Sequence, residues 1–363
     1  MIFYKPLKSF LEEYNDKNVD NKYKTVAVGK YGIRTRESIY SKELAKDYSK
    51  NKLIYKNTLT VGMGSKQIDI GILSDDHVFS VSPAYHTFKI SNINPDYLRY
   101  CLQARNPDMF IRYVKRGSRQ GKAIDLKRWL TYEIPIHEKL VQKEIVKTLD
   151  VVKDLLEAYK EELDRYDELV KSRFVEMFGS IHHSTEYPYL PVEEIASVVS
   201  GGTPSRAKPE YWENGKIPWV KTTELQNNII TTVEEYITEE GLKGSSAKIV
   251  PKNTVLIAMY GQGKTRGMTG FLGIDASTNQ ACACLLPSDK INSVFLWKYF
   301  ELSYTELREM AKGGNQPNLN GNMIKNFPVL MPPMNLQEQF VDFVNQVDKS
   351  KLTLCRYNIN VNK

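Results

Sequence analysis

One segment of the chain, residues 140–178, constrains the fold more than any other because it contains no glycine, no proline and many charged residues. Apolar side chains recur there at alternating spacings of four and three, the pattern of a coiled-coil seam: Ile145, Leu149, Val152, Leu156, Tyr159, Leu163, Tyr166 and Val170. Gly179 follows, and glycine commonly ends a helix. We therefore predict one continuous helix over 139–178 that needs a partner helix.

The C-terminal segment is the best candidate for that partner. Its apolar residues recur at helical spacing, namely Leu336, Phe340, Phe343, Val347 and Leu354. The expected helix, about 336–357, is shorter than the first. Either this distal helix is truncated, or the unpaired end of the first helix finds another partner. The seam could also be covered by another chain.

The two helical segments resemble each other, and so do the segments before them. QKEIVKTLD (142–150) matches QEQFVDFVN (337–345), and four earlier features match in the same order: EIPI (133–136) with VLMPP (329–333), RGSRQGK (116–122) with KGGNQPN (312–318), YLRYCL (97–102) with FLWKYF (295–300), and KNTL (56–59) with KNTV (252–255). A constant offset of 195 to 199 positions indicates a tandem repeat.

The repeat divides the chain into two mixed domains, each followed by a long helix. We predict domain one at 1–138, its helix at 139–179, domain two at 180–335 and the distal helix at 336–363. Short β-rich runs bounded by Gly, Pro, Asn and Ser dominate both domains, with one or two short helices. The predicted fold class is α+β, with two tandem domains separated by long helices that form an antiparallel coiled coil.

Charge and hydropathy favour an anionic partner and a cytosolic location. The chain carries a net charge of +7, whereas residues 139–178 hold eight Lys or Arg against ten Asp or Glu, so the basic surplus lies in the two domains. No run approaches 18 apolar residues, and the N-terminus lacks the regions of a signal peptide. We expect a cytosolic protein.

The stretch AMYGQGKTRG (258–267) fits a relaxed phosphate-binding P-loop, which raises the alternative of a nucleotide-dependent enzyme. The apolar run before it suits a strand, but Gly267, Gly270 and Gly273 disfavour the helix that a P-loop needs next. At the same place in domain one, LTVGMGSKQI (59–68) keeps glycines and a lysine without the Gly-Lys-Thr order. That variation favours a loop that faces a nucleic acid over a site for ATP.

Other motifs do not assemble an active site. NPDY (94–97) is close to the NPPY motif of adenine methyltransferases, but Asp96 replaces the second proline and no glycine-rich cofactor loop precedes it. We interpret it as a turn that caps a helix from Tyr97. Cys282 and Cys284 in ACACLL are expected in a strand, not in a metal site. None of the five histidines has neighbours typical of a catalytic group.

The segment SGGTPSRAKPEYWENGKIPWVKTTEL (200–225) closely resembles the opening of a target-recognition domain in the specificity subunit of Type I restriction-modification systems. YGQGKTRG (260–267) and LQEQFVDFVNQVDKSK (336–351) resemble that family too. The resemblance implies two recognition domains that each read half of a split DNA sequence, with the coiled coil as a ruler between them. It also implies a subunit without catalysis or a cofactor of its own, bound to two adenine methyltransferase subunits and ATP-dependent restriction subunits. S-adenosylmethionine, ATP and magnesium would belong to those partners.

The resemblance and the residue chemistry together predict which residues contact DNA. Hydroxyl, amide and cationic side chains suit phosphates and base edges, and we expect these contacts in domain two from Thr203, Ser205, Lys221, Thr222, Thr223, Gln262, Lys264 and Arg266. In domain one, where no GGTPS loop occurs, we expect Arg34, Arg36, Ser65, Lys66, Gln67 and Arg119. Tyr211 and Trp212 are expected to pack beneath their loop. For these residues, the alternative is that they are ordinary exposed polar side chains. For the whole chain, the alternative is a coiled-coil scaffold without DNA specificity.

Overall fold

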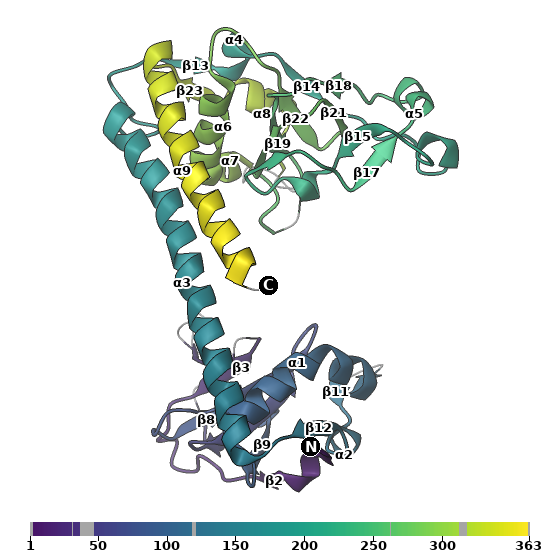
Figure 1. Ribbon diagram of the computed structural model, residues 1–363, viewed down its shortest axis with the longest axis vertical. Helices are drawn as coiled ribbons and strands as arrows, with labels where there is room; N and C mark the ends of the chain where they lie inside the picture. Colours follow the sequence, from purple (N-terminus) through teal and green to yellow (C-terminus); the bar gives the residue numbers. More distant parts are fainter. Residues whose placement is uncertain are drawn as a thin grey trace. The chain divides into compact units, whose positions relative to one another are not determined.

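The computed structural model describes residues 3–30, 32–36, 47–117, 121–261, 263–311 and 318–361; at 116, 117, 121 and 354–361 only the backbone is described. Arg119 and Gln262 lie outside these residues. The chain divides into two compact units, Met1–Ala158 (unit 1) and Tyr159–Lys363 (unit 2), so the boundary falls inside the long helix α3, Lys139–Phe178 (Figure 1). Each unit is considered by itself.

Unit 1 is built on a four-stranded antiparallel sheet in the order β2-β9-β6-β7, with bounds Leu11–Tyr14, His86–Ile90, Thr58–Met63 and Ile68–Ile72. Helix α1, Pro95–Tyr113, packs on this sheet, and Leu98, Leu102 and Met109 lie in the same buried core as Leu59 and Phe88. The Asn94 side chain accepts a hydrogen bond from the Tyr97 amide and caps α1. NPDY is therefore a helix cap, as expected, although the helix begins at Pro95, two residues earlier than predicted.

Two hairpins and two pairs of strands distant in the sequence complete the described part of unit 1. They are β3 with β4 (Val26–Gly29, Gly32–Thr35), β5 with β8 (Lys52–Ile54, Phe79–Val81), β10 with β11 (Val114–Gly117, Gly121–Ile124), and β1 with β12 (Phe3–Pro6, Glu133–Ile136). A short 3-10 helix, Leu7–Ser9, follows β1, and α2, Leu126–Trp129, precedes β12. Trp129 is fully buried beneath the sheet beside Phe88.

Unit 2 repeats this arrangement and adds to it. Its main sheet has the order β14-β22-β19-β20-β16, with bounds Val198–Ser200, Cys282–Leu285, Val255–Ala258, Thr269–Leu272 and Asn228–Ile230. A second sheet has the order β17-β15-β21-β18, with bounds Glu235–Ile237, Ile217–Val220, Ala276–Thr278 and Ile249–Val250. The remaining pair is β13 with β23, Tyr189–Pro191 and Pro328–Leu330. The α+β class is confirmed.

The short helices of unit 2 are α4 to α8 and two 3-10 turns. Their bounds are Val192–Ile195, Glu239–Lys243, Ser293–Leu302, Tyr304–Met310 and Gly321–Lys325 for α4 to α8, and Pro209–Tyr211 and Thr222–Glu224 for the 3-10 turns. Helix α6 contributes Phe295 and Tyr299 to a core that also contains sheet residues Val255 and Ile257. It lies between the main sheet and the long helices (Figure 1).

The tandem repeat extends to single hydrogen bonds. Asn57 has a left-handed φ of 61° and donates its amide to the carbonyl of Leu73 at 2.8 Å. Asn253 has a φ of 69° and donates to Leu272 at the same distance. Asparagine tolerates this backbone region better than most residues. The two KNT segments therefore form the same turn, each before the long central strand of its sheet.

A buried glutamine joins each long helix to its domain in the same way. The Gln142 side chain accepts from the Asn94 amide and the Gln337 side chain from the Asn292 amide, both at 2.9 Å. Each glutamine also donates to a carbonyl of the segment just before its helix at 2.8 Å. Because both side chains are almost fully buried, these bonds fix the start of the helix against the domain.

The two long helices pair through an aromatic core in unit 2. Helix α9, Met334–Val361, lies along the C-terminal half of α3 (Figure 1), and Phe174 of α3 packs 5.5 Å from Phe340 of α9, measured between ring centroids. An ion pair between Lys351 and Asp167 fixes the opposite end of the contact, so the helices are antiparallel. Helix α3 has the predicted bounds and ends at Gly179, with a φ of 77°. Helix α9 begins two residues before the predicted start at 336.

Candidate nucleic-acid interface

The predicted seam is covered by α9 over part of its length. Val170 of α3 is buried with Phe340 and Val347 of α9, and Tyr166 and Phe343 are partly buried beside them. Tyr159 and Leu163 are half-buried. Ile145 packs instead against the core of unit 1.

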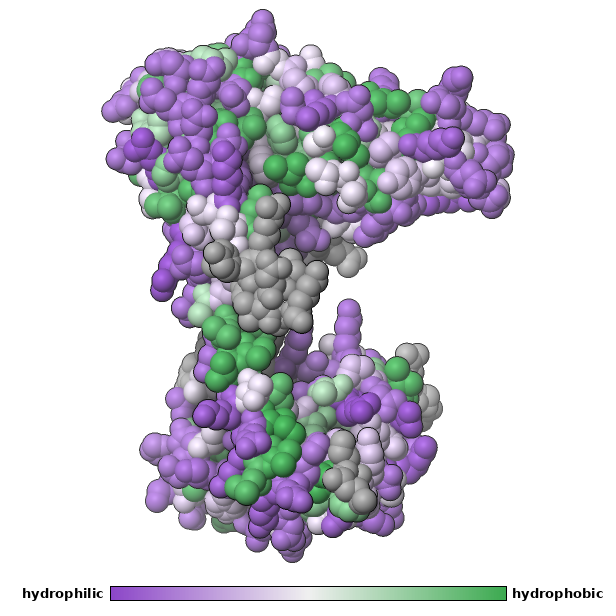
Figure 2. All heavy atoms as spheres, viewed as in Figure 1, coloured by the Kyte–Doolittle hydropathy of each residue, from purple (hydrophilic) through white to green (hydrophobic). Residues whose placement is uncertain are grey.

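The remaining seam residues Leu149, Val152 and Leu156 are 36%, 47% and 56% exposed. A 28-residue antiparallel helix cannot cover a 40-residue helix along its whole length. The neighbouring Val151 and Leu155 are also exposed, and Figure 2 shows hydrophobic side chains along this part of α3. We call Leu149, Val151, Val152, Leu155 and Leu156 the apolar strip; it is a surface of the kind that binds other proteins.

The Gly-Lys-Thr segment of unit 2 is a loop between two strands. It leaves β19 at Ala258 and enters β20 at Thr269, and its base is closed by the Gly267 amide bonded to the Ala258 carbonyl at 2.9 Å. A phosphate-binding P-loop needs the N-terminus of a helix directly after the glycines, where unpaired amides point at the phosphate. A strand follows here, so the P-loop interpretation does not fit.

Two cations lie in the second half of this loop. Lys264 is exposed and Arg266 is half-buried. Neither side chain has a hydrogen-bond or ion-pair partner among the residues that the structure describes, and the Arg266 Nε is buried without one. Because burying an unpaired cationic nitrogen is unfavourable, the arrangement favours an anionic ligand.

The GGTPS loop is held by two tryptophans. The indole N–H of Trp219 donates to the Gly202 carbonyl at 2.9 Å, and that of Trp212 to the Ser205 carbonyl at 3.1 Å. A side chain at Gly201 would overlap the backbone of Thr278, so this glycine is needed for close packing within the chain.

Thr203 and Ser205 remain accessible on that loop. Thr203 is half-buried and donates its hydroxyl to the Gln280 side chain, whereas Ser205 is exposed. Tyr211 is buried beneath the loop, and the Arg206 guanidinium stacks 3.6 Å from the ring centroid of Trp212. Both aromatic residues thus pack within the domain.

Lys221 is neutralised within the domain. Its ammonium lies 2.7 Å from a Glu234 carboxylate oxygen and 2.9 Å from one of Glu235. Hydrogen bonds to these two carboxylates raise the pKa of Lys221. Thr222 is buried and Thr223 is exposed, so the structure separates these three candidates instead of presenting them on one surface.

In unit 1 the loop between β6 and β7 gathers three of the nominated residues. Ser65 and Lys66 are exposed, and the Gln67 side chain lies 3.5 Å from Asp69. Lys122 of β11 donates its ammonium to the Ser65 carbonyl, a contact that sequence reasoning did not identify. This contact joins residues 57 positions apart, and neither segment contains a motif that predicts it.

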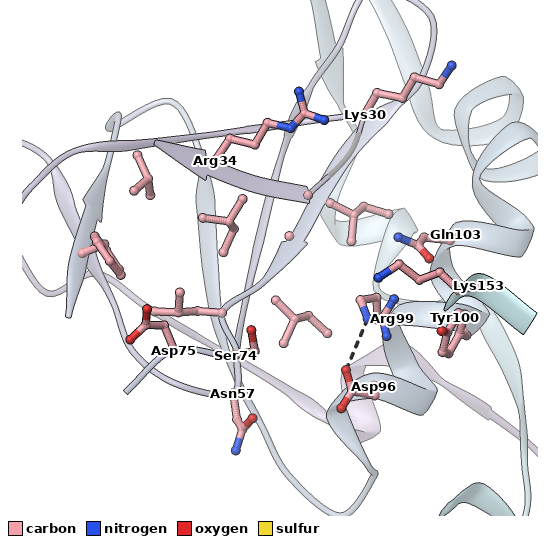
Figure 3. Close-up of a pocket in the computed structure, with 18 of the residues that line it drawn as sticks. Lys30, Arg34, Asn57, Ser74, Asp75, Asp96, Arg99, Tyr100, Gln103 and Lys153 are labelled. Atoms are coloured by element: carbon pink, nitrogen blue, oxygen red, sulfur yellow. Dashed lines mark hydrogen bonds and ion pairs between the residues drawn. The ribbon is translucent and has the colours of Figure 1, made fainter. Parts of the chain in front are cut away.

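The other nominated arginines of unit 1 lie elsewhere. Arg36 donates to the Tyr48 hydroxyl at 3.3 Å. Arg34 lines a separate cavity of about 850 Å³ (Figure 3). That cavity also contains the ion pair of Arg99 with Asp96, 3.3 Å apart, and the exposed Asp75. Its mixed charges do not form a convergent anion site, and it lies in a different unit from the Gly-Lys-Thr loop.

Cys282 and Cys284 are buried in β22, as expected for a strand, and burial raises the pKa of the Cys284 thiol to about 11. Across the described ranges, no cluster of three or more His, Cys, Asp or Glu side chains could hold a metal ion. Within those same ranges, no helix combines the length and the hydropathy needed to cross a membrane.

Comparison with known proteins identifies relatives that match part of the chain. The chain is 26% identical over 211 residues to the Type I restriction enzyme EcoR124I/EcoR124II specificity subunit of Escherichia coli, covering 57% of this chain and 52% of that protein. It is 28% identical over 165 residues to the Type I restriction enzyme MjaIX specificity subunit of Methanocaldococcus jannaschii, covering 43% and 37%. The matches thus span about half the length of these curated relatives or less.

Solved structures share the fold along the whole chain. The S subunit of a Type I restriction-modification system from M. genitalium matches with a TM-score of 0.54 at 16% identity, covering 100% of this chain and 93% of that one. A chain from a study of complex assembly and conformational transition of the type I R-M system matches with a TM-score of 0.52 at 16% identity, covering 99% and 93%.

The family model described as Type I restriction modification DNA specificity domain matches residues 4–165 and again residues 186–361. The two matches coincide with the two copies of the repeated sheet and long helix. The resemblance seen in the sequence is confirmed, and the chain belongs to the family of Type I restriction modification DNA specificity domains, of which it carries two.

Proposed function

We propose that this chain is the DNA-recognition subunit of a Type I restriction-modification complex, in which each specificity domain reads one half of a bipartite DNA sequence. One observation carries the proposal: the side chains of Lys264 and Arg266 lie on a held loop without a partner in the described structure, whereas Lys221 of the same unit is neutralised. The net charge of +7 suits a polyanionic ligand.

The side chains at the two loops fit base recognition. Arginine can donate two hydrogen bonds to guanine in the major groove, lysine can donate to guanine or phosphate, and glutamine can pair with adenine. Arg266 and Lys264 supply these groups in unit 2, and Lys66 and Gln67 supply them in unit 1. The accessible hydroxyls of Thr203 and Ser205 suit phosphate contacts. Because the loops differ in composition, the two half-sites should differ in sequence.

The apolar strip on α3 is the docking surface that we propose for an adenine methyltransferase subunit. Its five aliphatic side chains are 36% to 63% exposed, and burying them would provide a hydrophobic driving force for association. Catalysis, S-adenosylmethionine, ATP and magnesium would belong to the methyltransferase and restriction subunits, and this chain would supply specificity alone.

Paired substitutions test the docking surface. Leu155→Glu with Leu156→Glu should abolish copurification of the methyltransferase, because two carboxylates would have to be buried in the interface. DNA binding by the chain itself should persist. Lys160→Glu, a charge change of similar size on the same helix, should leave copurification intact; a complex that survives the leucine changes would exclude this surface.

Methylation mapping tests the proposed function as a whole. A host that carries this chain with its methyltransferase should show methylated adenines in a split sequence, one in each half, separated by a spacer of constant length. Loss of the chain should remove that methylation. A host in which no bipartite sequence is methylated would contradict the proposal.

A further inference from the structure

Helix α7 holds the cationic loop of unit 2 from outside. The Tyr304 hydroxyl donates to the carbonyl of Lys264 at 2.7 Å, and the Arg308 Nη1 donates to the carbonyl of Arg266 at 3.0 Å. Arg308 also donates to the Tyr304 hydroxyl at 3.1 Å, and its guanidinium lies 5.3 Å from the centre of the tyrosine ring. Tyr304, Arg308 and the two carbonyls thus form one connected group, which we call the α7 clamp.

The α7 clamp bonds the backbone carbonyls of the two residues whose side chains are unpaired. Lys264 and Arg266 have their carbonyls bound while their cationic ends have no partner in the described part of the chain. Fixing a carbonyl fixes the plane of its peptide group. Holding the peptide groups that follow Lys264 and Arg266 restricts the ψ of Lys264 and the backbone dihedrals of Thr265 and Arg266. The backbone conformation in turn limits the directions that the two cationic side chains can take.

Two bonds inside the loop act on neighbouring peptide groups. The Gly267 amide bonds to the Ala258 carbonyl at 2.9 Å, and the Met268 amide bonds to the Thr265 carbonyl at 3.0 Å. These bonds hold the peptide groups on either side of Arg266, whereas the Lys264 carbonyl is held by Tyr304. Without the clamp, the backbone at Lys264 would have to be ordered when DNA binds, at a cost in conformational entropy for each residue fixed.

We propose that Tyr304 and Arg308 are positioning residues for DNA specificity, and that they set the directions in which Lys264 and Arg266 meet the half-site read by unit 2. The inference rests on the proposed function and adds to it two residues outside the loop itself. Neither residue needs to touch a base. Their contribution is to sequence discrimination, because non-specific attraction to DNA depends mainly on the number of cations.

Unit 1 holds its corresponding loop by a different contact. Lys122 of β11 donates to the carbonyl of Ser65, between β6 and β7. The held group is again a carbonyl of the loop, but the donor comes from a hairpin instead of a helix. A change to the α7 clamp should therefore leave the half-site of unit 1 unaffected.

Selection from a library of randomised duplex DNA tests this inference with the full-length chain. The wild-type chain is expected to select two conserved sequence blocks, and the double variant Lys264→Ala with Arg266→Ala identifies the block read by unit 2. Tyr304→Phe removes one hydroxyl, and Arg308→Ala removes the guanidinium. Each should reduce discrimination in that block at least about fivefold, the lower end expected for a base contact.

Several controls separate positioning from folding and from charge. Arg308→Lys keeps a cationic donor and should retain more discrimination than Arg308→Ala. Tyr236→Phe, at the exposed position of β17, and Arg165→Ala, at an exposed position of α3, remove the same groups outside the loop and α7. Both should select the wild-type sequence, and the single variants at Tyr304, Arg308, Tyr236 and Arg165 should bind a fixed non-specific duplex within about threefold of wild type.

The outcomes distinguish a failure of the α7 clamp from a failure of the proposed function. A wild-type chain that selects two blocks, with both blocks intact in Tyr304→Phe and Arg308→Ala, would overturn the α7 clamp and leave the proposed function standing. Equal loss of both blocks would also overturn it, because that result indicates a general defect. A wild-type chain that selects no sequence would overturn the proposed function itself.

Discussion

The two units share one framework of strands, turns and helix contacts, and they differ in the side chains that their equivalent loops expose. The left-handed asparagine turns and the buried glutamines Gln142 and Gln337 coincide bond for bond. An asparagine also caps the helix that packs on each sheet, Asn94 in unit 1 and Asn292 in unit 2. The loops at equivalent positions share no such identity: one presents Ser65 and Lys66, the other Lys264 and Arg266. Positions that determine the fold are thus separate from positions available for specificity, so the loops can diverge without loss of the sheet.

Removing an aromatic side chain from the α3–α9 contact should have the largest effect. Phe174 is fully buried, with ring centroids 5.0 Å from Phe178 and 5.5 Å from Phe340. Phe174→Ala should cost unit 2 about 3 to 5 kcal/mol of unfolding free energy, measured by denaturant unfolding with hydrogen exchange to assign each transition to a unit. Unit 1 should unfold as in the wild type.

Two substitutions on the same helix make that comparison quantitative. Ile145 is only partly buried against the core of unit 1, so Ile145→Ala should destabilise unit 1 by less than the Phe174 change destabilises unit 2. Leu156→Ala lies in the apolar strip and should change stability by no more than about 0.5 kcal/mol. Equal costs at Phe174 and Leu156 would contradict the observed burial.

The buried glutamines test whether the shared framework is equivalent in energy as well as geometry. Gln142→Ala and Gln337→Ala each leave an asparagine amide and a carbonyl without their bonds, which should cost about 1 to 3 kcal/mol per site. The two losses should agree within about 1 kcal/mol. Chemical denaturation provides the measurement, and Gln226→Ala, at an exposed site, provides the control. A large loss of stability at one site alone would show that the two glutamines share their geometry but not their contribution to stability.

Much of this framework could be predicted, because it depends on local signals. The heptad spacing and Gly179 fixed both ends of α3, and the constant offset identified the repeat before any contact was known. Contacts between distant residues could not be predicted. Glu234 and Glu235, which neutralise Lys221, lie 13 and 14 positions from it, and Tyr304 and Arg308 lie 40 and 42 positions from the carbonyls they hold. Which cations stay unpaired is therefore a property of the tertiary structure.

Substitutions in the two loops should separate the half-sites. Lys264→Ala or Arg266→Ala should weaken recognition of one half-site by about 1 to 3 kcal/mol if the side chain contacts a base. Lys66→Ala should act on the other half-site alone. Binding titrations with duplexes that carry one altered half at a time provide the measurement. An equal loss with every duplex, together with a smaller salt dependence, would instead identify phosphate contacts.

The smallest expected effect concerns acid stability of unit 2. Glu235 accepts hydrogen bonds from Arg206 and Lys221, and these two cations, Arg206 first, lower the pKa of its carboxyl group. A carboxyl group with a lowered pKa stabilises the folded state above its unfolded pKa, and that contribution is lost as the pH falls through the folded pKa. Unit 2 should therefore lose stability as the pH falls below about 4.3, the usual glutamate value.

The size of this acid effect is limited by exposure. The Glu235 side chain is 28% exposed, so solvent screens the pair and the contribution should stay below about 1 kcal/mol. Glu235→Gln should remove it, so the difference in unfolding temperature between neutral and acidic pH becomes smaller for the variant than for the wild type. Glu213→Gln, at an exposed site in the same segment, should leave that difference unchanged. If both variants behave alike, the acid sensitivity of unit 2 arises from its general charge and not from the carboxylate shared by Arg206 and Lys221.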